Sequence, residues 1–159
     1  MKWSDVLEDK SLRDLPYKVE LNEHGSITMT PASNRHGKLQ SLISHLLRNQ
    51  MYDGDVISEC SIQTDRGVKV ADVAWMSDTF FKTHGDATPF PQAPEVCIEI
   101  VSPSNSKREL DEKVAVYFAS GASEVWVCSD TGQITIYAAG GNVGNASTLF
   151  PEFPPSINS

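Results

Sequence analysis

Two carboxylates and a lysine in the second half of the chain have the residue types and spacing of a hydrolytic site. Glu99 is the one acidic residue inside the apolar run VCIEIV, where a carboxylate without a partner is costly. Asp72 lies in the middle of a second apolar run, VKVADVAW. Lys113 follows on a segment with helical spacing, three residues after Leu110 and four before Tyr117.

Side chains alternate between the two faces of a strand, so Asp72 and Glu99 can meet across a pair of neighbouring strands. Two like charges at short range repel each other unless a cation lies between them. Mg²⁺, with Mn²⁺ as a substitute, is the natural cation for such oxygen ligands. The backbone carbonyl of Ile100 is expected to add a ligand, and water and a substrate phosphate to complete the shell.

Lys113 has a long apolar stem that can lie along the buried face of its helix while the amine reaches the carboxylates. A metal ion acidifies a water molecule and stabilises charge on phosphorus oxygens. The lysine would orient that water or stabilise the transition state. Asp72, Glu99 and Lys113 therefore form a competent set for phosphodiester hydrolysis.

Each of these residues also has an interpretation without catalysis. Asp72 could be a solvated carboxylate, and Glu99 could form an ion pair that only stabilises the fold. Lys113 could be an exposed helix lysine paired with Glu109, four residues before it. The serines of SPSNS (102–106) are expected to be caps and turn formers, because no His–acid relay accompanies them.

The segment from Pro94 to Cys128 predicts the unit that positions Glu99 and Lys113. Its order is a strand, a cap-rich turn, a helix and a second strand, which makes a right-handed crossover between parallel strands. The expected bounds are Glu95–Val101 for the first strand, Ser104 or Ser106 to Gly121 for the helix, and Glu124–Cys128 for the second strand.

The remaining elements predict an α/β fold, with a central mixed sheet and a helix on either face. The turn-linked strands should be antiparallel. Expected are a helix over Lys2–Leu15 with Ser4 as N-cap, a hairpin over Tyr17–Met29, a long helix starting at Ser33 or Asn34, strands Val56–Ile62 and Val68–Trp75, a loop Met76–Pro94 with a helical turn at Asp78–Lys82, and strand Gln133–Tyr137.

Length and composition further limit the possible domain organisation, partners and cellular compartment. A chain of 159 residues is expected to form one domain, with its core over about 17–138 and a mostly irregular tail over 139–159 that packs Leu149 and Phe150 on the body. The net charge of −8 argues against an extended basic surface for nucleic acid without excluding one. Three cysteines without a CxxC motif indicate a reducing, cytoplasmic compartment, and no apolar run is long enough for a membrane span.

Several segments resemble the Uma2 family, which is regarded as a restriction-endonuclease-like branch of the PD-(D/E)XK nuclease superfamily. The resemblance covers roughly Tyr17 to Tyr137. It is carried by ADVAW (71–75), PEVCIEIVSPS (94–104), LDEKVAVYFASGASEVWV (110–127) and, more loosely, VELNEHGSITMTPASNRHGKL (19–39).

This resemblance implies a restriction-endonuclease-like fold and makes Asp72 the motif aspartate and Glu99 the motif glutamate. Val101 stands two residues after Glu99, where the superfamily has its lysine, and Lys113 on the following helix takes that place. Glu20 matches the acidic residue of the first hairpin, which is a further catalytic carboxylate in the wider superfamily.

The function expected from this resemblance is Mg²⁺-dependent hydrolysis of DNA phosphodiester bonds. An inactive binding or scaffold protein with a nuclease fold is the alternative, because of the negative net charge and the missing strand lysine. His36 matches the histidine at the start of the long helix, and we expect it to form hydrogen bonds there rather than act as a base. A homodimer is expected because double-strand cleavage needs two sites, with Trp75, Phe80 and Phe81 near a loop.

Overall fold

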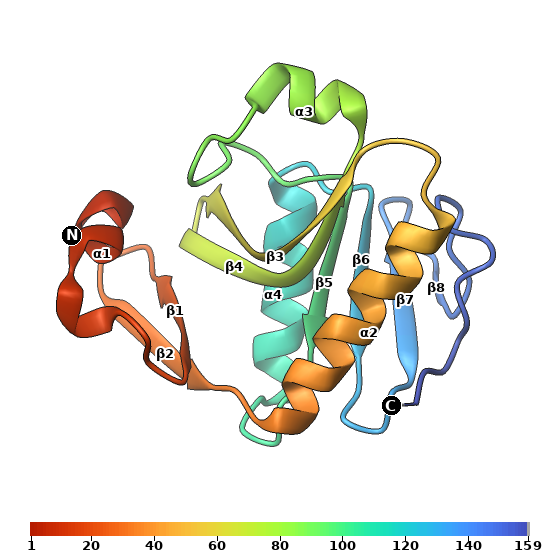
Figure 1. Cartoon of the computed structure of the whole chain (residues 1–159), viewed down its shortest axis with the longest axis horizontal. Coiled ribbons are helices and arrows are strands. Elements are labelled where there is room, and N and C mark those ends of the chain that lie inside the picture. Colours follow the sequence, from red (N-terminus) through yellow and green to blue (C-terminus); the bar gives the residue numbers. More distant parts are fainter. Residues whose placement is uncertain (159) are drawn as a thin grey trace.

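The computed structural model describes residues 1–158, which form two sheets (Figure 1). The larger sheet has six strands in the order β3-β4-β5-β6-β7-β8, and β1 and β2 form a separate hairpin. The strands are β1 (Tyr17–Leu21), β2 (Ile27–Pro31), β3 (Asp55–Thr64), β4 (Gly67–Met76), β5 (Val96–Ile100), β6 (Glu124–Cys128), β7 (Ile134–Ala138) and β8 (Val143–Gly144). The helices are α1 (Trp3–Glu8), the 3₁₀ turn η1 (Lys10–Leu12), α2 (Asn34–Gln50), α3 (Asp78–His84) and α4 (Lys107–Ala119).

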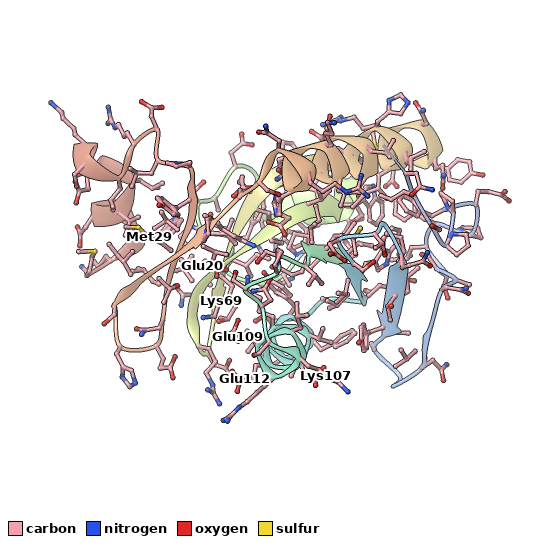
Figure 2. All side chains as sticks on the ribbon, turned by 90° about the horizontal axis from the view of Figure 1, so that it is seen from below. Glu20, Met29, Lys69, Lys107, Glu109 and Glu112 are labelled. Carbon is pink, nitrogen blue, oxygen red and sulfur yellow. The ribbon has the colours of Figure 1, made fainter. Side chains whose placement is uncertain are left out.

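The predicted fold class is confirmed: the six-stranded sheet is mixed and is flanked by helices. Strands β5 and β6 are parallel and joined through α4, whereas the other neighbouring strands are antiparallel. Figure 2 looks along α4 and shows the sheet between α2 and α4. Residues of α2 pack on one face with Val73 and Ile98, and those of α4 pack on the other with Cys97 and Val125.

Both flanking helices begin at a serine cap, because a serine hydroxyl can accept a bond from a free N–H group of the first turn. Ser33 accepts from His36, and Ser106 accepts from Glu109. Apolar residues then recur every three or four positions and face the sheet. The buried ones are Leu39, Ile43 and Leu47 on α2, and Val114 and Tyr117 on α4.

The hairpin covers the part of β4 that β5 leaves unpaired. Strand β4 has ten residues, but its register with β5 covers only Val73–Trp75. The hairpin comes so close to the β3–β4 turn that a Cβ on Gly67 would lie 2.3 Å from the carbonyl oxygen of Leu21. Gly67 also has a φ of +90°, which side chains disfavour. The apolar contacts involve Trp3, Val6, Leu21, Val68 and Val70.

The prediction of one helix over Lys2–Leu15 is wrong. Helix α1 ends at Glu8, and Lys2 rather than Ser4 is its N-cap. Asp9 then adopts an extended backbone, and its side chain accepts a hydrogen bond from the backbone N–H of Ser11. Such local side-chain bonds compete with helical ones, so the chain continues as a single 3₁₀ turn.

The prediction of a mostly irregular tail that packs Phe150 on the body is confirmed, but the burial of Phe153 and Ile157 goes beyond it. Phe150 is 3% exposed and Phe153 5% exposed, and both rings make edge contacts with Trp126. Leu149, expected on the body, is 41% exposed. The tail thus supplies part of the core on the α2 face, where Ile157 is also buried.

Buried Glu124 holds this tail against β6. Its carboxylate accepts hydrogen bonds from the Ser147 hydroxyl at 2.7 Å, the Thr148 N–H at 2.9 Å and the Trp126 indole at 3.1 Å. Donors from three residues compensate for the burial of the charge.

Across residues 1–158, none of the helices combines the length and apolar character required to cross a bilayer.

The Phe153→Ala variant is expected to lose about 3–5 kcal/mol of unfolding free energy, because it leaves a cavity beside Trp126. Urea denaturation measures the loss. The matched control is Leu149→Ala in the same tail, where exposure predicts a change of about 0.5 kcal/mol or less. Equal losses in the two variants would contradict the assignment of Phe153 to the core.

Candidate active site

Asp72 and Glu99 meet across β4 and β5, as the alternation of their strands predicted. The register pairs Val73 with Ile98, so one further step places Asp72 opposite Glu99. The two residues are only 1% and 4% exposed and line the same small cavity. The buried pair of carboxylates is therefore a feature of the fold, while its catalytic role stays a prediction.

Lys18 of β1 joins the two carboxylates. Its Nζ lies 3.0 Å from Asp72 Oδ1 and 3.0 Å from Glu99 Oε2. Burial disfavours the charged amine, but Glu99 and Asp72 outweigh that effect and raise the pKa of Lys18. The sequence pattern did not single out Lys18. The signal that could have identified Lys18 is its spacing of two residues from Glu20, which places both side chains on one face of β1.

Lys113 of α4 lies on the other side of Glu99. Its Nζ is 3.1 Å from Glu99 Oε1 and 3.0 Å from Glu20 Oε2, so the amine faces the carboxylates as expected. The Tyr117 hydroxyl, one turn further along α4, donates a 2.6 Å hydrogen bond to the same Glu99 oxygen. Both oxygens of Glu99 are thereby occupied by donors.

Glu20 lies at the edge of this cluster of carboxylates and lysines. Its carboxylate accepts a 2.7 Å hydrogen bond from the backbone N–H of Val70, which ties the hairpin to the unpaired side of β4. Burial would raise the pKa of Glu20, but Lys113 and Lys18 outweigh it and lower that pKa. Glu20 does not line the cavity that Asp72 and Glu99 share, and its catalytic role stays a prediction.

Asp72 is held in its ionised form by several donors. The backbone N–H of Ile100 donates to Oδ2 at 2.7 Å, and the His36 ring lies 3.2 Å from Oδ1. Burial would raise the pKa of Asp72, but Lys18 and His36 outweigh it and lower that pKa. Glu99 differs, because burial dominates over Lys113 and Lys18 and raises its pKa. The two carboxylates are thus electrostatically unequal.

His36 does more than the expected hydrogen bonding at the start of α2. Its backbone N–H donates to the Ser33 hydroxyl at 3.1 Å, as expected for that position. Its ring, which the sequence did not place, contacts Asp72, and this hydrogen bond raises the pKa of His36. Protonated His36 would add positive charge beside Asp72.

The backbone is strained directly across from Asp72. Glu59 of β3 has a φ of +55°, a left-handed conformation that costs a non-glycine residue roughly 1–2 kcal/mol. The carbonyl of Asp72 accepts a 2.7 Å bond from the Gln40 side chain, which also donates to Glu59 at 2.8 Å. Gln40 of α2 therefore fixes the backbone from which the Asp72 carboxylate projects.

Two spaces adjoin the cluster. The small cavity measures about 30 Å³, which is room for one or two water molecules, and Ile100, Ser102 and Asn105 are among the other residues that line it. A larger groove of about 650 Å³ runs between the hairpin and α4 and reaches Glu99 and Lys113. Figure 2 shows three residues of its lining in a row from the hairpin to α4, namely Glu20 of β1, Lys69 of β4 and Glu109 of α4.

The donor atoms at the small cavity fit Mg²⁺ in kind, since Asp72 and Glu99 offer hard carboxylate oxygens and Ile100 borders the same space. Within residues 1–158, no cluster of three or more His, Cys, Asp or Glu residues is arranged to hold a metal. A bound ion would therefore depend on water, on a substrate phosphate and on the predicted Ile100 carbonyl. The amine of Lys18 already contacts the carboxylate oxygens that such an ion would use.

Comparisons with known proteins identify a family and a solved structure to which the chain is similar. The sequence profile of the Uma2 family, described as "Putative restriction endonuclease", matches residues 9–156. The chain belongs to the Uma2 family. Its structure is similar to a crystal structure described as "a putative nuclease belonging to DUF820" from Anabaena variabilis ATCC 29413, with a TM-score of 0.72. That similarity covers 87% of this chain and 86% of the other at 17% sequence identity, and it supports the fold.

A comparison with curated proteins gave no match. The description of the Uma2 family supports a nuclease function.

The contact between His36 and Asp72 predicts a pH-dependent stabilisation that His36→Gln removes. The pKa of His36 is raised above 6.5 in the folded state, so its stabilisation is complete below that pH and is lost as the pH rises through the folded pKa. The variant should be less stable by about 1 kcal/mol at acidic pH, with the difference shrinking at alkaline pH.

Urea denaturation at about pH 5.5 and about pH 9 measures this difference. The control is His45→Gln, which changes an exposed histidine of the same helix. A stability difference that is independent of pH would contradict an ion pair between His36 and Asp72.

Proposed function

We propose that this Uma2-family protein is a Mg²⁺-dependent nuclease that hydrolyses DNA phosphodiester bonds. The observation that carries the proposal is that Asp72 and Glu99, from adjacent strands, line one cavity with Lys113, whose amine is 3.1 Å from Glu99. The family description supports the same class of activity.

In this proposal Asp72, Glu99 and the Ile100 carbonyl would hold the metal. When bound, Mg²⁺ would supply an acidified water and a positive centre for the phosphate oxygens. Lys113 borders both the small cavity and the groove, so its amine can orient the attacking water or stabilise charge that develops on the phosphate. Tyr117 and Glu20 restrain Glu99 and Lys113.

The groove is the path by which a nucleic acid strand would reach these residues. Its basic side chains are Arg66, Lys69 and Lys113, while Glu109 and Glu112 make part of the α4 wall acidic. Only about three phosphates can be neutralised there, so the logarithmic salt dependence of binding should have a shallow slope of about −3. Divalent ions would then contribute much of the affinity for the polyanion.

Cleavage of both strands of a duplex would require two such sites, so a homodimer remains part of the proposal. Of the apolar residues expected near an interface, Trp75 and Phe80 are buried in the protein's own core. Only Phe81, which is 46% exposed, is available for contact with a second copy.

The variants Asp72→Asn and Glu99→Gln are each expected to reduce Mg²⁺-dependent DNA cleavage to the uncatalysed background, because each removes a charged metal ligand. Cleavage of a labelled DNA substrate measures the rate, and circular dichroism checks the fold. The matched control is Glu109→Gln, an exposed glutamate of the groove wall, which should retain activity. Full activity of a folded Glu99→Gln protein would rule out the site.

The Lys113→Met variant is expected to cleave DNA about 100-fold more slowly, because it loses a charge that stabilises the transition state. The affinity for uncleaved DNA, measured by fluorescence anisotropy, should change much less. The control is Lys107→Met, an exposed lysine of the same helix. An effect on affinity alone would make Lys113 a binding residue rather than a catalytic one.

A second candidate function is an inactive binding or scaffold protein. It is favoured by one observation: Lys18 and Lys113 form ion pairs with Asp72 and Glu99, so the protein itself supplies positive charge to both carboxylates. Calorimetric titration with Mg²⁺ or Mn²⁺ distinguishes the two functions. Absence of binding by the native protein would favour the scaffold, whereas binding that Asp72→Asn abolishes would favour the nuclease.

A further inference from the structure

We propose that Lys18 is a built-in counter-ion that occupies the position of the divalent metal and competes with it. The metal would bind only when the side chain of Lys18 leaves the space between Asp72 and Glu99. This inference rests on the proposed metal site, and it adds a residue on the first hairpin that sets the metal affinity.

The distances make the two cations mutually exclusive. The Nζ atom lies 3.0 Å from one oxygen of Asp72 and 3.0 Å from one oxygen of Glu99, at the junction of the two carboxylates. Mg²⁺ takes oxygen ligands at about 2.1 Å, so an ion held by Asp72 and Glu99 would need the space beside these oxygens that the ammonium group fills. The small cavity of about 30 Å³ offers no second place for a hydrated ion beside it.

The charges of the cluster also favour an exchange over an addition. Three buried carboxylates, those of Glu20, Asp72 and Glu99, face the two amines of Lys18 and Lys113. With the neighbouring His36 in its neutral form, this leaves one negative charge. Replacing the Lys18 ammonium by a divalent ion makes this cluster neutral. Adding the ion while Lys18 remains would make the buried cluster positive and force two cations together.

The fold provides a place for the displaced side chain. Thr30 of β2 is paired with Lys18 in the hairpin, and it lines both the small cavity and the large groove. Lys18 can therefore rotate past Thr30 into a groove of about 650 Å³, a volume ample for its amine. The backbone of the hairpin would stay in place, because Glu20 holds it to Val70.

Calorimetric titration with Mn²⁺ tests the competition on three proteins: the native chain, Lys18→Met and Lys10→Met. Lys10 is an exposed lysine of the same N-terminal region, so its variant matches the charge change. Lys18→Met is expected to bind Mn²⁺ about tenfold more tightly or better, because the competing charge is gone. Lys10→Met should bind as the native chain does.

Two outcomes would overturn the proposal, and they differ in what else they affect. Equal affinities in the native chain and Lys18→Met would show that Lys18 does not compete, while the metal site and the proposed function would stand. No binding by any of the three proteins would remove the metal site itself and the proposed function with it.

A measurement on the native chain covers the case in which Lys18→Met fails to fold. Acetylation of lysines by a limiting reagent, followed by mass spectrometry, reports how accessible each amine is. Lys18 should react slowly without metal and about tenfold faster or more in saturating Mg²⁺, because the amine is released into the groove. Lys10 should react at the same rate in both conditions. An unchanged rate at Lys18 would overturn the proposal.

Discussion

Asp72 and Glu99 can be buried side by side only because cations lie against them. Two adjacent carboxylates in a dry environment would repel each other and lose their hydration, a cost of several kcal/mol per ion. Lys18 and Lys113 offset this cost through ion pairs of 3.0–3.1 Å. Since each amine comes from a different element, the carboxylates tie those elements to the centre of the sheet.

This requirement accounts for much of the architecture around β4. The hairpin covers the half of β4 that β5 does not reach, and there it presents Lys18 and Glu20. Helix α4 crosses the face on which Glu99 lies and contributes Lys113 and Tyr117 to it. Helix α2 on the opposite face begins next to Asp72 and supplies His36. Each carboxylate is thus satisfied by residues that are distant in sequence.

The need for positive charge beside the two carboxylates also determines which groups the site of this Uma2-family protein can bind. A cluster that needs positive charge between two oxygens can take it from a lysine or from a divalent ion. In the proposed exchange, a divalent ion would supply the positive charge that Lys18 supplies in this position. The groove beside the cluster has both basic and acidic side chains, which is consistent with the net charge of −8. Positive charge is therefore needed mainly at the carboxylates of the site.

The sequence by itself determined strands β1 to β7 and the flanking helices, and it determined that Asp72 and Glu99 share a face. Those features follow from the spacing of apolar side chains, which repeats every two residues in a strand and about every 3.6 residues in a helix. This spacing can be read directly from the sequence. The helical spacing also placed Lys113 on the side of α4 that faces the sheet. Local rules failed where a side chain competed with the helix, as at Asp9.

Only the tertiary structure decided which residues complete the site. Lys18 and the ring of His36 reach the carboxylates because the hairpin docks on β4 and α2 begins beside Asp72, and no period in the sequence encodes such docking. The tail was decided in the same way, because irregular backbone has no repeat to reveal that Phe153 is buried against Trp126. Periodic patterns specify the face of an element, whereas the partner of that face is set by long-range packing.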